Sequence, residues 1–206
     1  IPAGADLLLQ MHYGPSPIEE TDLTEVNVFF AEEPIEREVE TGIMGPQHLD
    51  QFFFLPANQE RTFHGTMDVA ADLSLLSVAP HCHLIGVYWE VYATSPNNQD
   101  TIPLISIPSW DFNWQGFFTF PTLTKIPAGY TLHGIASYDN TSANPFNPND
   151  PPQNVAFGEG TTDEMFFVFF DYVLYEEGDE LIALGPSDDV PCVGDLTGDG
   201  VVSVED

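Results

Sequence analysis

The sequence predicts an all-β chain, folded as an antiparallel jelly-roll β-sandwich. Helix signals are scarce, because no stretch keeps the apolar period of an amphipathic helix. Short β-branched or aromatic runs recur instead, separated by Pro, Gly and Asn, and 43% of the 206 residues are hydrophobic. Many short strands with turns between them are typical of a sandwich or a jelly roll.

Six runs have the composition and spacing of strands. In chain order they are ADLLLQMHY (5–13), TEVNVFFAEE (24–33), LSLLSVAPHCHL (73–84), GVYWEVYAT (86–94), TLHGIASY (131–138) and EMFFVFFDYVLYEE (164–177). Between the last two, the polar stretch 139–154 contains four prolines. Proline removes a backbone donor and fixes φ, so this stretch is predicted to be a long loop.

A short internal repeat suggests how the chain is divided into domains. IPAGADLLLQMHYG (1–14) lines up with IPAGYTLHGIASYD (126–139), and the second copy lies well inside the main β region. The first copy is therefore expected near the end of a preceding, similar domain. We predict closing strands of that domain and a linker in 1–40, a jelly-roll domain in 41–177, and an acidic tail in 178–206.

The charge of the chain is extreme, with 33 acidic residues against 3 Lys and Arg and a formal net charge of -30. Such a surface repels nucleic acid and anionic membranes and concentrates cations. No run of eighteen apolar residues is present, so no membrane span is expected. A salty medium outside the cell would screen this charge, so we expect a secreted protein, either extracellular or periplasmic.

The stretch SVAPHCHLIGVYWEVYAT (77–94) places two histidines one residue apart at the head of an apolar run. Positions i and i+2 of a strand share a face, so His81 and His83 can share one metal ion while Cys82 points away. Two hydrogen-bonded core histidines are the alternative. A buried free thiol at Cys82 is favoured over a disulfide with Cys192.

A third ligand for the histidine pair must come from elsewhere, and Met165 is the candidate. It follows an acidic turn and opens a Phe-rich strand, where a thioether can point into a cleft. Two imidazoles and a thioether form a soft donor set that favours copper over zinc, calcium or magnesium. Simple core packing of the methionine is the alternative.

Three motifs in order, LLLQMHYGPSP (7–17), PHCHLIG (80–86) and TTDEM (161–165), give the chain a wider likeness. It resembles the copper type II, ascorbate-dependent monooxygenases, the family of peptidylglycine α-hydroxylating and dopamine β-monooxygenase. IPSWDFNWQ (107–115) is similar to the bacterial members. The resemblance implies two jelly-roll domains, each with one copper. This agrees with the internal repeat, which also predicts a preceding, similar domain.

By this resemblance, His81 and His83 correspond to the histidine pair of the catalytic copper, and Met165 corresponds to its thioether ligand. His12 corresponds to the third histidine of the electron-transferring copper, with Gln10 beside it. The two adjacent histidines of that second site are expected upstream of residue 1. The chain by itself is then expected to hold one complete copper site and to be inactive alone.

Two departures from the family bear on the substrate. Ala79 stands where the peptide-processing members carry an Arg that grips the substrate carboxylate. Phe167 and Phe169 stand at alternate positions after the methionine where polar residues are expected. A small apolar or aromatic substrate is therefore expected rather than a peptide carboxylate.

The C-terminal stretch DLTGDGVVSVED (195–206) fits a calcium-loop template. It resembles the first repeat of a dockerin-type module, which implies bound Ca²⁺ and a dockerin-type partner. A flexible acidic end is the alternative. The ligands would be Asp195, Thr197, Asp199, the Val201 carbonyl, Ser203 and Asp206.

The sequence thus predicts a copper-dependent monooxygenase that hydroxylates a C–H bond with O₂ and a one-electron donor such as ascorbate. Two rivals remain. One is a non-catalytic extracellular β-sandwich module for adhesion or assembly, with a structural metal or none. The other is a zinc hydrolase, which would want a carboxylate or a histidine in place of Met165. His48, His64 and His133 are predicted to have no catalytic role.

Overall fold

The computed structural model divides the chain into two units, Ile1–Glu36 and Arg37–Asp206. Each is described by itself, and the second carries the β-sandwich. The residues described are 4–11, 13–14, 16–30 and 34–184.

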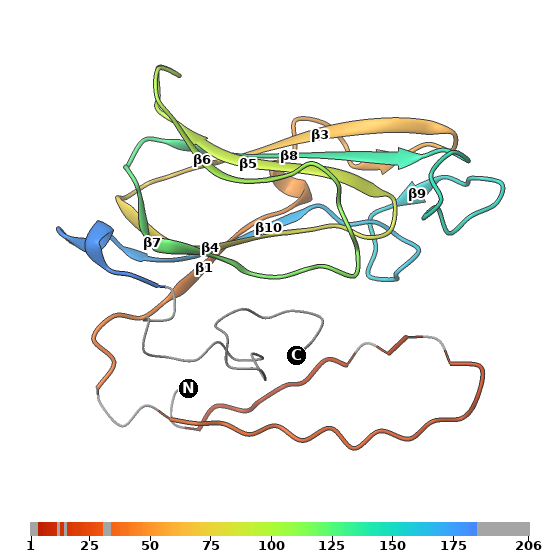
Figure 1. Cartoon of the computed structure of the whole chain (residues 1–206), viewed down its shortest axis with the longest axis horizontal. Helices are drawn as coiled ribbons and strands as arrows, with labels where there is room; N and C mark the ends of the chain where they lie inside the picture. The colour runs from red at the N-terminus through yellow and green to blue at the C-terminus, as the bar shows by residue number, and fades with distance from the viewer. Residues whose placement is uncertain (1–3, 12, 15, 31–33, 185–206) are drawn as a thin grey trace, which may run out of the picture. The chain divides into compact units, whose positions relative to one another are not determined.

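The sandwich is built from antiparallel strands in two four-stranded sheets (Figure 1). One sheet has the order β1-β10-β4-β7 and the other β3-β8-β5-β6, and the short β2 and β9 pair separately. The strands are β1 (Glu40–Met44), β2 (Phe54–Leu55), β3 (Gln59–Asp68), β4 (Leu73–His81), β5 (Gly86–Thr94), β6 (Thr101–Ile107), β7 (Phe118–Ile126), β8 (Thr131–Asn140), β9 (Val155–Ala156) and β10 (Phe167–Leu174).

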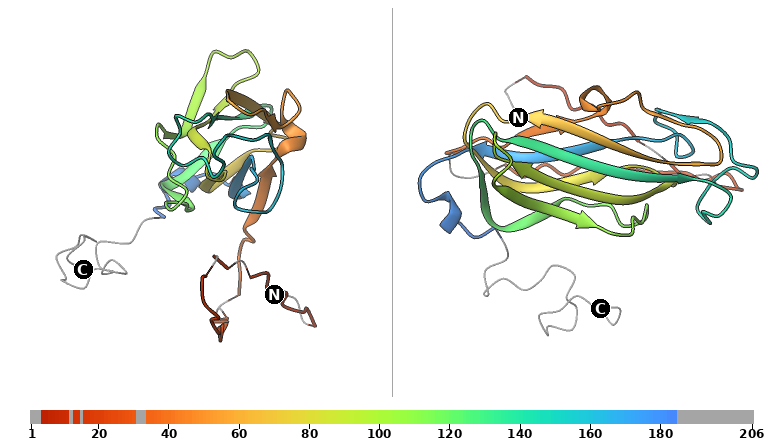
Figure 2. Two further views of the ribbon diagram at one scale, coloured as in Figure 1. Left: turned by 90° about the vertical axis from the view of Figure 1, so that its right-hand side faces the viewer. Right: turned by 90° about the horizontal axis from the view of Figure 1, so that it is seen from above.

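The predicted all-β sandwich is confirmed. Figure 2 shows the two layers from two further directions, and in the view from above the strands run along the length of the sandwich. Successive strands repeatedly switch sheets, as from β3 to β4 to β5. This switching favours the jelly-roll connectivity, which stays a prediction at that finer level. In the described residues, no helix is long and apolar enough to span a membrane.

The core lies between the two sheets and is rich in aromatic side chains. Phe53, Phe63 and Tyr138 pack with ring centroids 4.7–5.7 Å apart. Strand β8 alternates half-buried and buried residues along its whole length, which is the pattern of a strand with one face on a core. Trp89 and Phe166 add a further buried pair, with centroids 4.8 Å apart.

Strand β10 is central to its sheet, because it pairs with β1 on one side and β4 on the other. Val168 and Phe170 face the core and are almost fully buried. The alternate positions Phe167 and Phe169 point to the outer face of the sheet, where they are half-buried. The outer face therefore carries aromatic side chains next to β4.

An ion pair attaches Arg37, the first residue of the second unit, to the sandwich. The Arg37 guanidinium donates to both carboxylate oxygens of Asp179, at 2.7 and 2.9 Å, and to the carbonyl of Leu174. The Asp179 carboxylate also accepts a hydrogen bond from the Ser74 hydroxyl at 2.6 Å. Arg37 belongs to the sandwich for this reason, four residues before the predicted boundary at 41.

The sandwich also extends beyond its predicted end at residue 177. The short 3₁₀-helix η2 (Asp179–Leu181) follows β10 and contacts β7. Beyond it, the Leu123 amide donates to the Ile182 carbonyl at 3.2 Å, and the Leu184 amide donates to Pro121 at 2.9 Å. These bonds add backbone along the otherwise open edge of β7.

The predicted strands at 5–13 and 24–33 are wrong for the residues that the structure describes. No strand is formed by 4–11, 13–14 or 16–30. Their apolar side chains are open to solvent, with Leu8 and Phe29 both 93% exposed. A strand is stabilised when it covers an apolar core, and these described segments leave their apolar side chains in solvent.

Candidate metal centre

The histidine pair lies at the end of β4. His81 is the last residue of the strand, and His83 follows after the backbone leaves the sheet. Their imidazole rings lie close together, with centroids 5.2 Å apart and planes at 81°. His81 is half-buried and His83 is buried. The two imidazole rings are therefore adjacent and meet edge to face.

Cys82, between them, points into the core. Its Sγ accepts a hydrogen bond from the Trp89 indole at 3.1 Å, and the residue is fully buried. Gly86 allows this close approach, because a Cβ at that position would lie 2.2 Å from the Cys82 sulfur. Burial, together with the nearby Glu164, raises the pKa of the thiol well above its ordinary value. Cys82 is a buried free thiol, and Cys192 lies outside the described residues.

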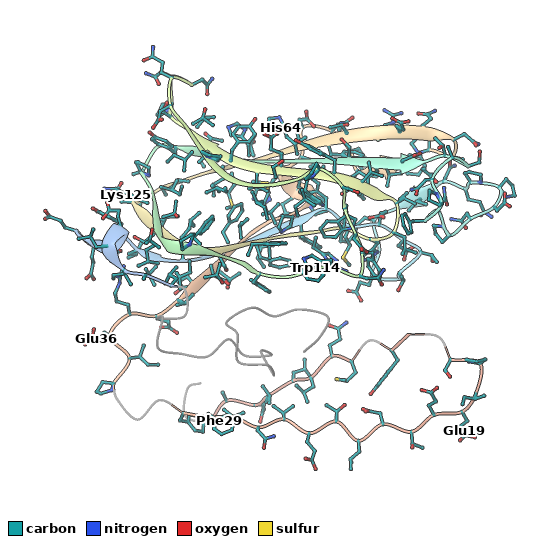
Figure 3. The ribbon with its side chains drawn as sticks, in the orientation of Figure 1. Glu19, Phe29, Glu36, His64, Trp114 and Lys125 are labelled. Atoms are coloured by element: carbon teal, nitrogen blue, oxygen red, sulfur yellow. The ribbon has the colours of Figure 1, made fainter. Side chains whose placement is uncertain are left out.

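The loop between β6 and β7 fixes the ring of His81. The His81 Nδ1 donates to Gln115 Oε1 at 2.6 Å. The amide nitrogen of Gln115 donates in turn to the Phe112 carbonyl at 2.6 Å, so its oxygen is the atom turned toward the histidine. Trp114, exposed on the same loop, is labelled in Figure 3.

His83 is held from three directions. Its Nδ1 donates to the Asp163 carbonyl at 3.0 Å. Its own carbonyl accepts a hydrogen bond from the Trp110 indole at 3.1 Å, and the Phe112 ring meets the imidazole edge-on at 5.9 Å between centroids. The ring orientation is thus set by contacts on both sides.

Both histidines share one tautomer as a consequence. Each Nδ1 meets an oxygen that can only accept, so each Nδ1 carries the proton. In the neutral form of each ring, Nε2 then keeps its lone pair, and no described residue hydrogen-bonds to either Nε2. Histidines that bind a metal through one ring nitrogen usually donate the N–H of the other ring nitrogen to an oxygen acceptor.

A buried carboxylate joins the histidine segment to the methionine segment. Glu164 is 1% exposed, and its Oε2 accepts from the backbone amides of His83 at 2.8 Å and Met165 at 3.1 Å. Its Oε1 accepts from the Ile85 amide at 2.9 Å. One side chain therefore positions both backbone segments.

Met165 lies on a segment next to the histidines. It comes two residues before Phe167, the first residue of β10, which pairs with His81 at the end of β4. The Met165 carbonyl accepts a hydrogen bond from the Tyr138 hydroxyl at 2.8 Å, and the side chain is half-buried. The two imidazoles and the thioether thus come from neighbouring backbone segments.

Burial sets the charge states around the centre. It lowers the pKa of His81, an effect that His83 reinforces and the Gln115 hydrogen bond opposes. The imidazole is therefore neutral at neutral pH, as a metal ligand must be. Burial also raises the pKa of Glu164 to about 7, although backbone amides that donate to its carboxylate oppose the rise.

The donor types at this position decide which metals fit. In the part of the chain that the structure describes, no three side chains of His, Cys, Asp or Glu lie close enough to hold one ion. The donors gathered here are two imidazoles beside a thioether-bearing segment, a nitrogen and sulfur set that copper accepts well.

The other predicted ligands are not brought to this centre by the described structure. Gln10 is exposed and belongs to the first unit. His12 lies outside the described residues, as does the whole calcium-loop prediction: Asp195, Thr197, Asp199, Val201, Ser203 and Asp206.

Sequence reasoning missed Gln115 and Glu164. Glu164 had a usable signal, because it shares the alternation phase of Phe166, Val168 and Phe170, which are all buried. A carboxylate in phase with a core face must be satisfied by hydrogen bonds. Gln115 had no such signal, since its role depends on how an irregular loop returns to the end of β4.

The fold and the site define an all-β sandwich with two adjacent histidines, one half-buried and one buried, at the end of β4. No protein-family model matches the chain, and no curated protein matches it. Among solved structures, it is similar to "Structure of infectious bursal disease virus Gt strain", with 12% identity and a TM-score of 0.26. That match covers 76% of this chain and 44% of the viral one, so this chain spans less than half of its length. A likeness at this level carries no functional argument.

Proposed function

We propose that His81, His83 and Met165 hold one copper ion, and that this chain is part of a secreted copper-dependent monooxygenase. The reaction would insert one atom of O₂ into a C–H bond and release the other as water. The two electrons would come from a one-electron donor such as ascorbate. One observation carries the proposal: both Nδ1 atoms donate to fixed oxygen acceptors, so both Nε2 lone pairs are available to a metal.

The second support is the position of the thioether segment. Glu164 accepts hydrogen bonds from the backbone amides of both His83 and Met165, and Met165 comes two residues before Phe167, the cross-strand partner of His81. Copper bound by such a set would supply one-electron redox chemistry with dioxygen, since a weak thioether suits Cu(I) and open positions remain.

The protein's own residues would perform the remaining tasks. Gln115 and the Asp163 carbonyl hold the imidazoles in one orientation and would keep them ordered as ligands of a bound metal. Phe112 packs against His83 and limits water on that side. The half-buried rings of Phe167 and Phe169 provide an apolar surface next to His81.

The resemblance to the monooxygenase family extends the proposal beyond the sandwich. His12 and Gln10 would belong to an electron-transferring copper site completed by residues outside this sequence. The C-terminal loop 195–206 would bind Ca²⁺. Both ideas rest on the sequence motifs alone.

The test is copper titration of the 206-residue chain, followed by X-ray absorption in the Cu(I) and Cu(II) states. One copper per chain is expected, with a sulfur contribution in the Cu(I) spectrum. Met165→Leu should remove that sulfur signal, because leucine keeps the volume and lacks the thioether.

Two matched controls accompany this variant. Met67→Leu changes a half-buried methionine on β3, and His64→Ala changes a histidine on the other sheet (Figure 3). Neither should alter the stoichiometry or the sulfur signal. A chain that binds no copper, or that gives the same Cu(I) spectrum without Met165, would reject the assignment and favour a non-catalytic sandwich module.

A further inference from the structure

We propose that the substrate is a neutral, hydrophobic molecule with a planar ring, bound in an apolar hollow that leads over Phe167 to His81. This inference rests on the proposed copper function, which it extends by naming the class of substrate. Three features support it: a row of aromatic rings, a hollow at one end of that row, and the positions of the three Lys and Arg residues.

The row of rings crosses the outer face of the sheet that contains β10. Phe157 meets Phe167 with centroids 5.9 Å apart, Phe167 meets Phe169 at 5.9 Å, and Phe169 meets Phe117 at 6.3 Å. The two outer members stay open to solvent, with Phe157 46% and Phe117 61% exposed. Rings at these separations offer faces and edges to a further ring.

The row borders the histidine pair. Phe167 is the direct cross-strand partner of His81, and Phe169 is the partner of Ala79. Directly opposite residues of an antiparallel pair project to the same side of the sheet. A molecule lying on Phe167 therefore lies next to the His81 imidazole.

A hollow of about 580 Å³ opens at the Phe157 end of the row. Gln47 supplies its one polar side chain, and Gly45 keeps room beside it, because a Cβ there would lie 2.7 Å from the Phe167 ring. The volume is in the range of small-molecule sites. The lining residues are Pro46, Gln47, Phe52, Phe53, Ala156, Phe157 and Phe167.

The positions of the Lys and Arg residues argue against an anionic substrate. The sequence contains three Lys and Arg in all, and none lines the hollow. Arg37 is bound to Asp179, Lys125 lies near Asp72 and over the Tyr175 ring, and Arg61 lies on β3 of the other sheet. A carboxylate would enter an apolar hollow without a cationic partner and against a net charge of -30. A neutral molecule avoids both the burial of an unpaired charge and the repulsion by the acidic protein.

The experiment compares 2-naphthylmethanol with 2-naphthoate, which have the same ring system and differ in charge. Binding to the 206-residue chain is measured by calorimetry, first without metal and then with Cu(I). The alcohol should bind in both forms, and the carboxylate should bind at least about tenfold more weakly. Equal affinity for the two probes, or no binding of the alcohol to the folded chain, would overturn the inference.

Variants locate the site. Phe157→Ser removes a ring that is already half exposed and should weaken binding of the alcohol about tenfold. Phe146→Ser changes a 65% exposed ring outside the hollow and should leave binding unchanged. Equal effects of the two substitutions would contradict the placement. If a second copy of the chain covered the hollow instead, sedimentation would show a dimer that Phe157→Ser dissociates, and this too would overturn it.

Copper titration of Phe157→Ser separates this inference from the proposed function. Retained copper binding with weakened naphthyl binding is expected, because Phe157 supplies no metal ligand. If the wild-type chain binds copper and not the alcohol, the substrate class is wrong and the copper site stands. If it binds the alcohol and not copper, the hollow stands and the monooxygenase assignment fails.

Discussion

Gln115 is the side chain on which the orientation of His81 depends. Its amide oxygen accepts from the imidazole, and its amide nitrogen is held by the Phe112 carbonyl. The residue touches the ligand and not the metal, so its effect would be on positioning. Partners of this kind change metal affinity by about 10–100-fold when they are removed.

Gln115→Leu should therefore lower copper affinity by about 10–100-fold, while the far-ultraviolet circular dichroism stays unchanged. Gln115→Glu keeps an acceptor oxygen and adds negative charge, so it should retain affinity and lower the Cu(II)/Cu(I) reduction potential. Gln59→Leu, on the exposed end of β3, is the control. A shift of potential equal in Gln115→Leu and Gln115→Glu would argue against this role.

At the scale of elements, a second histidine pair joins strands of the other sheet. His64 Nε2 on β3 lies 2.9 Å from His133 Nδ1 on β8, and His133 Nε2 lies 2.9 Å from the Thr94 hydroxyl on β5. The Tyr92 ring stacks on His133 with centroids 4.7 Å apart. Burial lowers the pKa of His133, and the adjacent His64 lowers it further.

This pair should make part of the stability pH-dependent. The folded-state pKa of His133 lies below the unfolded value of about 6.5, so the unfolded chain takes up the proton first as pH falls. Stability is therefore lost as pH decreases through about 6.5. Urea unfolding at pH 8 and pH 5 would show a smaller change for His133→Gln than for the wild type. Comparison with the variant removes the contribution of the carboxylates, which both proteins share.

Strands were predictable from the sequence where alternation was strong. The run 86–94 matches β5 from end to end, and 131–138 matches most of β8. Strand β3 was missed because four of its first residues are exposed and polar, so no apolar alternation marks them. Prolines at 103 and 121 interrupt the patterns of β6 and β7, which tolerate them at a bulge and at the edge of a sheet.

The candidate site was predictable only in its ligand types. The i, i+2 spacing of His81 and His83 suggested a shared strand face, but β4 ends at His81, so the proximity of the two rings depends on the turn that follows the strand. The oxygen acceptors of the two Nδ1 atoms depend on the loop before β7 and on the turn before β10. Neither contact leaves a mark on the local pattern, since each joins residues more than thirty positions apart.

At the scale of the whole molecule, the net charge of -30 opposes the compact state. Repulsion of this kind is screened as the Debye length falls from about 30 Å at 0.01 M salt to about 3 Å at 1 M. The Tm should therefore rise by several degrees between 0.01 and 1 M NaCl. An equal osmolality of sucrose controls for general exclusion effects, and a Tm that falls with salt would show that attractive ion pairs outweigh the repulsion.

The three tryptophans of the chain all lie around the histidine pair. The Trp89 indole donates to Cys82, the Trp110 indole donates to the His83 carbonyl, and Trp114 directly precedes Gln115. The indole fluorescence of this protein therefore arises from one small region, with no distant emitter to dilute it. A paramagnetic ion or a naphthyl ring arriving there is within reach of the emitting side chains, so the molecule carries its own optical reporter.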